Sequence, residues 1–76
     1  MYKELIKKLE PWDISEEDIR VETFKKYIGA EYYNRGVRVE LKEYDMSVSS
    51  FSEKSQKANL KRCFEIIETI LLNYTL

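Results

Sequence analysis

The chain has 76 residues and a net charge of −1, and it contains a single cysteine and no histidine. This composition excludes the usual proton shuttle near neutral pH, the Cys–His and Ser–His nucleophile pairs, and the zinc sites built from nitrogen and sulfur ligands. A chain of this length forms one domain, residues 1–76, with a small core. We expect no catalytic residues, no cofactor and no bound metal, and therefore no enzymatic activity.

The sequence predicts a protein that stays in the cytoplasm. Residues 1–10 mix lysines with apolar residues and lack the continuous apolar core of a signal peptide. No apolar run approaches the roughly 20 residues that cross a bilayer. A lone cysteine, Cys63, is typical of a reducing compartment because it has no disulfide partner in the chain.

A first helix is predicted over residues 2–10. Its apolar residues have the spacing of one helical face, and they are Tyr2, Leu5, Ile6 and Leu9. Pro11 ends this helix because the residue before a proline is pushed out of the α region. We expect Trp12 and Ile14, in the following connection, to cover the edge of the core.

Residues 16–28 fit either a strand or a helix, and we favour the strand. The helix has good cap signals, with Ser15 as N-cap, Asp18 in the first turn and Gly29 as C-cap. However, its apolar residues scatter over most of the helical wheel, and their β-branched content suits a strand.

A long antiparallel hairpin is predicted, with a four-residue loop at Tyr33–Gly36. The second strand alternates charged residues with apolar ones, which are Val37, Val39 and Leu41. Gly36 supports the loop because glycine adopts positive φ without strain. The resulting opposed pairs are Glu31 with Arg38, Ile28 with Leu41, Thr23 with Met46, and Val21 with Val48. The apolar residues change from even to odd positions along one strand and from odd to even along the other, and a twist or bulge in the hairpin accounts for this change.

Residues 53–74 form the clearest predicted element, an amphipathic helix capped by Ser50 or Ser52. One arc of its wheel is apolar and contains Leu60, Cys63, Phe64, Ile66, Ile67, Ile70, Leu71 and Tyr74. Cys63 is expected to be a small buried hydrophobe rather than a reactive thiol. The arc is wide enough to leave Ile66 or Leu72 for a second copy of the chain, and we therefore expect a homodimer.

These elements predict an α+β fold. An N-terminal helix, an antiparallel hairpin of two or three strands and a long C-terminal helix follow one another, and both helices pack on one sheet face. The other sheet face is expected to point towards solvent.

Binding to another protein is the predicted function. Six tyrosines in so short a chain is a high number, and tyrosine, tryptophan and arginine are the residues that anchor interfaces. The residues predicted to bind the partner are Tyr27, Tyr33, Arg35, Arg38, Lys42, Tyr44 and Trp12. Small, histidine-free domains rich in tyrosine and lysine are common among phage and mobile-element regulators or inhibitors of host proteins.

A nucleic-acid-binding regulator is the alternative from another class. It would use Arg35 and Arg38 in the hairpin together with the lysines at the start of the last helix. The near-neutral net charge makes this alternative weaker, because nucleic-acid-binding domains normally carry a clear basic excess.

Overall fold

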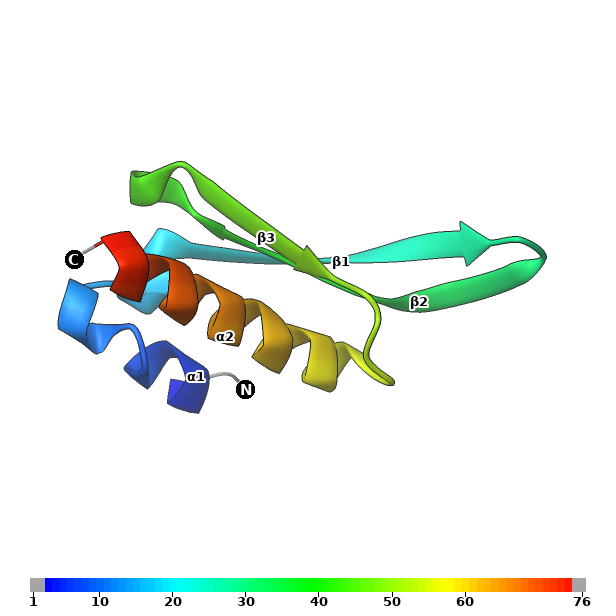
Figure 1. The fold of residues 1–76 in the computed structure, drawn as a ribbon, viewed down its shortest axis with the longest axis horizontal. Helices are drawn as coiled ribbons and strands as arrows, with labels where there is room; N and C mark the ends of the chain where they lie inside the picture. The colour runs from blue at the N-terminus through cyan, green and yellow to red at the C-terminus, as the bar shows by residue number, and fades with distance from the viewer. Residues whose placement is uncertain (1–2, 75–76) are drawn as a thin grey trace.

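The computed structural model describes residues 3–74, which form an α+β domain with one three-stranded antiparallel sheet. The elements in chain order are α1 (Lys3–Lys7), a 3₁₀ turn (Glu10–Trp12), a second 3₁₀ turn (Glu16–Asp18), β1 (Ile19–Ile28), β2 (Glu31–Leu41), a third 3₁₀ turn (Lys42–Tyr44), β3 (Met46–Ser50) and α2 (Gln56–Tyr74). This order confirms the predicted fold class. α1 and α2 contact each other on the same side of the sheet (Figure 1). Tyr2 and the side chain of Tyr74 lie outside the described part of the chain.

The N-terminal segment is shorter and more broken than the predicted helix. α1 ends at Lys7, and the next two backbone amides bond to carbonyls three residues back, at 3.2 and 2.8 Å. This tightening to 3₁₀ geometry accompanies the complete burial of Leu9. Pro11 lies at the start of the next 3₁₀ turn, where its missing N–H is not needed. Ile14 is buried and Trp12 packs against the core, as expected.

The strand is the correct structure for most of residues 16–28. The predicted helix cap is present but starts only a single 3₁₀ turn, Glu16–Asp18. The backbone N–H and the hydroxyl of Ser15 donate to the Asp18 carboxylate at 3.0 and 3.1 Å. β1 then begins at Ile19, because the β-branched residues beyond the turn favour the extended conformation.

The predicted hairpin loop at Tyr33–Gly36 is wrong, because these residues lie inside β2. The chain turns instead at Gly29 and Ala30, which separate the paired residues Ile28 and Glu31. Gly29 has a φ of 62° and Ala30 does not have positive φ, which is the pattern of a type II′ turn.

The turn position moves every predicted pair. The observed pairs that replace the predicted ones are Ile28 with Glu31, Glu22 with Arg38, Thr23 with Val37, Val21 with Val39, and Ile19 with Leu41. Val48 and Met46 belong to a separate strand, β3, which pairs with Val39 and Leu41 of β2. Val39 therefore lies between Val21 and Val48, which were predicted to face each other.

Gly36 serves close packing rather than a turn. It lies opposite Phe24, and a Cβ atom added to Gly36 would lie 2.4 Å from the nearest atom of that ring. Only glycine lets the ring rest on the backbone of β2 at this point. The glycine that the sequence marked as a turn residue is thus a packing residue in mid-strand.

α2 begins later than predicted, at Gln56, and its N-cap is Ser55. The Ser55 hydroxyl accepts a hydrogen bond from the Ala58 amide at 3.1 Å, the pattern of an N-cap. Ser50, one of the two predicted caps, lies in β3. Among the described residues, the buried apolar core contains Leu9, Ile14, Ile19, Val37, Val39, Leu41, Val48, Cys63, Phe64, Ile67 and Leu71.

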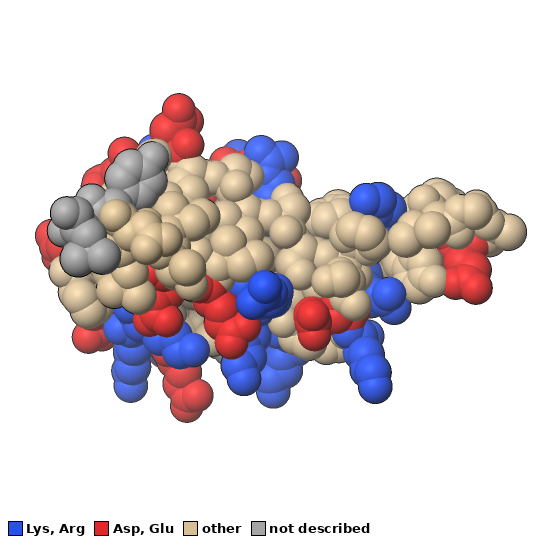
Figure 2. Space-filling view, viewed as in Figure 1, with Lys and Arg blue, Asp and Glu red and all other residues tan. Residues whose placement is uncertain are grey.

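The molecule is elongated, with extents of 43 × 25 × 18 Å, because the distal part of the hairpin projects past the start of α2 (Figure 1). α2 covers only the proximal part of the sheet. On the face shown in Figure 2, the projecting end presents mainly uncharged residues.

Candidate interaction surface

A β-bulge separates the projecting part of the hairpin from the sheet of the body. The register shifts between Phe24 and Lys26, so that Asn34 and Arg35 of β2 stand opposite the single residue Lys25 of β1. A bulge of this kind increases the local twist and turns the strands beyond it. We call residues 25–35, which lie from the bulge to the turn and back, the arm.

The start of α2 holds the base of the arm. The Gln56 side chain donates to the carbonyl of Asn34 at 2.7 Å, and the Asn59 amide donates to the carbonyl of Arg35 at 2.7 Å. These two carbonyls lie at the bulge, where the regular ladder is interrupted. The bulge is therefore tied to a long helix that packs on the core.

Asn59 is fully buried and has a partner for each of its amide atoms. Its side-chain oxygen accepts from the Ser50 hydroxyl at 2.8 Å and from the Glu53 amide at 3.0 Å. Its nitrogen also donates to the Glu53 carbonyl at 3.4 Å. This one side chain joins β2, the end of β3 and the loop before α2, which makes the arm's base rigid.

One face of the arm is occupied by contacts within the protein. The Tyr33 hydroxyl donates to the Glu31 carboxylate, and this hydrogen bond raises the pKa of Tyr33. The Arg35 guanidinium lies 4.2 Å from the centre of the Tyr33 ring and donates to the Phe51 carbonyl at 3.0 Å. On the neighbouring strand, the Lys26 ammonium lies 3.9 Å from the centre of the Phe51 ring. These side chains link the arm to the loop that follows β3.

The other face and the end of the arm are open to solvent. Tyr27 and Tyr32 face each other across the hairpin, with ring centres 5.0 Å apart and ring planes at 55°. The exposed fractions are 71% for Tyr27, 49% for Ile28 and 46% for Tyr32. Ile28 pairs with Glu31, so it lies on the Tyr33 face at the end of the arm, next to the turn. We call Tyr27, Ile28 and Tyr32 the tip cluster. The Lys25 ammonium stands behind it, 6.0 Å from the centre of the Tyr32 ring.

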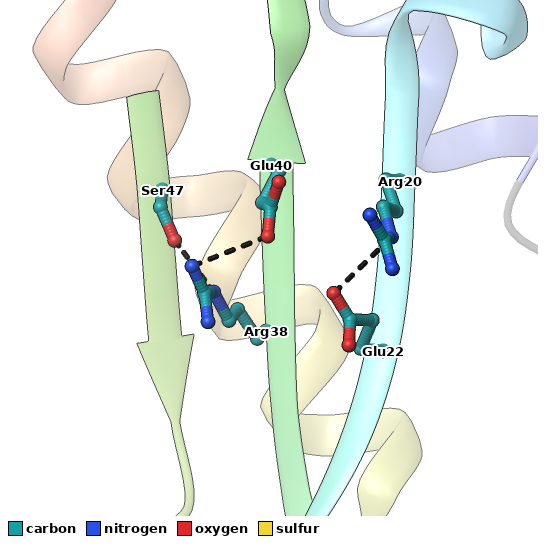
Figure 3. A network of polar contacts seen from close by, with 5 residues as sticks. All are labelled: Arg20, Glu22, Arg38, Glu40 and Ser47. Atoms are coloured by element: carbon teal, nitrogen blue, oxygen red, sulfur yellow. Dashed lines mark hydrogen bonds and ion pairs between the residues drawn. The ribbon is translucent and has the colours of Figure 1, made fainter. Parts of the chain in front are cut away.

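The sheet face opposite α2 carries charges that compensate one another (Figure 3). Arg38 donates to the Ser47 hydroxyl at 2.9 Å and pairs with Glu40 at 3.2 Å. Arg20 pairs with Glu22 at 3.2 Å on the neighbouring strand. Arg38, predicted as a partner-binding residue, is thus already engaged by two groups of its own chain.

The remaining predicted residues lie at the opposite end of the molecule from the arm. Tyr44 and Lys42 belong to the 3₁₀ turn between β2 and β3. The Tyr44 hydroxyl donates to the Trp12 carbonyl at 3.4 Å, which brings these two aromatic residues together. The seven predicted residues therefore fall into three places: the arm, the sheet face and this far end.

Sequence reasoning missed Tyr32, Ile28 and Asn59. The hairpin turn was placed too late in the chain, which set Ile28 opposite the core residue Leu41 and hid the exposure of Ile28 and Tyr32. Asn59 had a usable signal, because it lies four residues before Cys63 on the apolar stripe of α2. A polar residue on such a stripe predicts a buried hydrogen-bonding role.

Within the described residues, no group of three His, Cys, Asp or Glu side chains is placed to hold a metal ion. Cys63 is buried, and burial raises the pKa of its thiol to about 11. No helix in residues 3–74 is long and apolar enough to cross a membrane. Comparison with protein-family models, curated proteins and solved structures finds no match to this chain.

Proposed function

We propose that this chain is a small, non-enzymatic protein-binding module, acting in the cytoplasm, whose arm inserts the tip cluster into a partner protein. The observation that carries the proposal is the exposure of Tyr27, Ile28 and Tyr32 together at the end of a projecting hairpin. Exposed apolar side chains that gather at one end of a molecule can mark interaction sites, and tyrosine is among the residues that dominate interface energetics.

The anchoring of the arm supports the proposal. A loop that must become ordered on binding loses affinity through its conformational entropy. Here the base is already held by Gln56 and Asn59, and one face is held by Arg35 and Lys26. The tip cluster is thus presented on a preorganised support, which reduces that loss.

The nucleic-acid alternative has weaker support. It relied on Arg35, Arg38 and the lysines at the start of the last helix. Both guanidinium groups are engaged within the chain, one by the Phe51 carbonyl and the other by Glu40 and Ser47. A phosphate would have to displace these contacts. Protein binding needs no such displacement at the tip cluster.

Affinity capture with matched variants tests the proposal. The immobilised chain is exposed to nuclease-treated lysate of its source cells, beside Tyr27→Ala/Tyr32→Ala and a control, Tyr44→Ala, at the far end. We expect the control to retain its partner and the double variant to lose it, because each hot-spot residue contributes about 2 kcal/mol or more. Retention of the same partner by a folded double variant, or loss of every partner on nuclease treatment, would overturn the proposal.

A further inference from the structure

The near-neutral net charge conceals a strong separation of charge along the molecule. The arm and residues 51–62, which include the start of α2, contain seven basic and two acidic residues, a net charge of +5. The rest of the chain contains six basic and twelve acidic residues, a net charge of −6. Figure 2 shows basic side chains near the base of the arm, and both basic and acidic side chains over the body. The end that carries the tip cluster is the positive end.

The lysines of this end are not neutralised by their own chain. Within residues 3–74, the ion pairs involve Arg20, Arg38 and Arg62, and no lysine takes part in one. Lys25 and Lys26 are exposed, and their ammonium groups lie near aromatic rings, which do not neutralise their charge. Their charges are therefore available to a carboxylate on another molecule.

The distance from the tip cluster to these lysines sets how far the arm could enter a pocket before the lysines reach its rim. Strands rise about 3.3 Å per residue, so Lys25 and Lys26 stand roughly 7 to 10 Å behind Ile28 along the arm. An inserted arm would bury the tip cluster first and bring the lysines to the mouth of the pocket. Lys54 and Lys57, which flank Gln56 at the base of the arm, would follow behind them.

The tip itself favours a protein pocket over a nucleic acid strand. The residues between Tyr27 and Tyr32 are Ile28, Gly29, Ala30 and Glu31, so the end of the hairpin carries no basic residue that would contact a phosphate. An apolar pocket accommodates the tip cluster, and acidic residues around its mouth match the lysines.

We infer that the surface recognised by the arm is an apolar pocket of a protein with carboxylates around its rim. This inference rests on the proposed function and adds the chemical class of the partner site. The positive end then selects the partner and speeds its approach, while the tip cluster supplies most of the affinity.

Charge reversal at two places gives a matched test. Lys25→Glu/Lys54→Glu, called the arm variant, and Lys7→Glu/Lys8→Glu, called the α1 variant, change the net charge equally, but only the first lies at the positive end. Neither variant alters Lys26, which packs on the Phe51 ring. The probe is a ten-residue peptide of alternating Glu and Leu pairs, titrated into each isotopically labelled chain and followed by backbone amide shifts. A peptide with Lys in place of Glu and a fifteen-nucleotide oligothymidylate are titrated in parallel.

We expect the acidic peptide to shift the amides of residues 25–33 in the unaltered chain and in the α1 variant. The arm variant should bind it at least about fivefold more weakly, because exposed charges contribute up to about 1 kcal/mol each. Equal binding by both variants, preference for the basic peptide, or stronger arm shifts with oligothymidylate would overturn the inference. If one of these results is obtained but the Tyr27→Ala/Tyr32→Ala variant still loses its captured partner, the proposed function stands and only the acidic rim of the partner site is rejected.

Discussion

At the scale of single residues, Gly36 shows how one side chain's absence allows another to pack. The Phe24 ring lies directly over the Gly36 backbone, at a distance that no Cβ atom tolerates. Sequence alone suggested a turn, because glycine in a polar stretch is more familiar in that role. The alternation of Val37, Val39 and Leu41 was recognised correctly, since it depends only on local periodicity, whereas a cross-strand contact depends on a register that no local pattern specifies.

We predict that Gly36→Ala destabilises the protein by about 1 to 3 kcal/mol, because the added methyl group forces the Phe24 ring off the strand. The cost should be much smaller in a Phe24→Ala background, where the ring is gone. Urea denaturation of the two single variants and the double variant measures the coupling. If Gly36→Ala costs the same in both backgrounds, the Phe24 ring is not the reason why position 36 requires glycine.

Cys63 illustrates a residue whose role was predictable from sequence. Its position on the apolar stripe of α2 indicated a buried thiol, and the structure buries it against the carbonyls of Val37 and Val48 at 3.4 and 3.6 Å. Burial raises the pKa of this thiol to about 11, so its protonated form is favoured in the folded state.

We predict that the folded chain resists thiol-specific labelling at pH 8 and reacts at the normal rate once unfolded. Since the pKa of Cys63 is higher in the folded state, its contribution to stability is complete below the unfolded pKa and is lost as pH rises towards about 11. Between these pH values, the free energy of unfolding measured with urea should therefore fall more steeply with rising pH in the unaltered chain than in Cys63→Ala. Rapid labelling under native conditions would contradict the assigned burial.

At the scale of elements, the arm depends on α2 as much as on its own strands. Two strands alone are marginally stable, and the bulge interrupts their ladder at the point where the arm leaves the body. Asn59 and Gln56 compensate by bonding the bulge carbonyls. The helix was predictable from its periodicity, but its start at Ser55 was not, because four serines in this region offer competing caps.

We predict that Asn59→Ala destabilises the protein by about 2 to 4 kcal/mol, since it leaves several buried backbone and hydroxyl groups without partners. Asn73→Ala, an exposed asparagine of the same helix, is the control and should change stability by less than about 0.5 kcal/mol. Hydrogen exchange should also become faster in residues 33–36 of the Asn59 variant. A loss confined to α2, with arm protection unchanged, would show that the side chain does not hold the arm.

At the scale of the whole molecule, the fold class was predictable and the candidate surface only partly. Periodicity identified the strands and α2, and tyrosine content directed attention to Tyr27 and Tyr33. The tip cluster was not predictable, because its members meet only when the turn falls at Gly29. The charge separation along the molecule also depends on the fold, because it is the fold that brings the arm and residues 51–62 together at one end.

The sequence predicted a homodimer formed through α2, because the apolar arc of this helix is wide. The structure offers another surface for self-association, the tip cluster. Ile66 and Ile70 are partly buried and pack against the core, and among the described side chains of α2 the exposed large apolar residue is Leu72, at 52%. The tip cluster contains three exposed apolar side chains, and its Tyr27, at 71%, is more exposed than Leu72. A patch of this kind promotes association when no partner covers it.

We therefore propose that purified chain self-associates weakly through the tip cluster, and we predict that Tyr27→Glu shifts it to monomer. Leu72→Glu, which places the same charge on α2, should leave the association unchanged. Sedimentation velocity from micromolar to millimolar concentration measures both variants. If Leu72→Glu instead abolishes association, α2 forms the contact between copies. If the unaltered chain remains monomeric throughout, the tip cluster is tolerated in water, and its exposure is maintained for a different molecule.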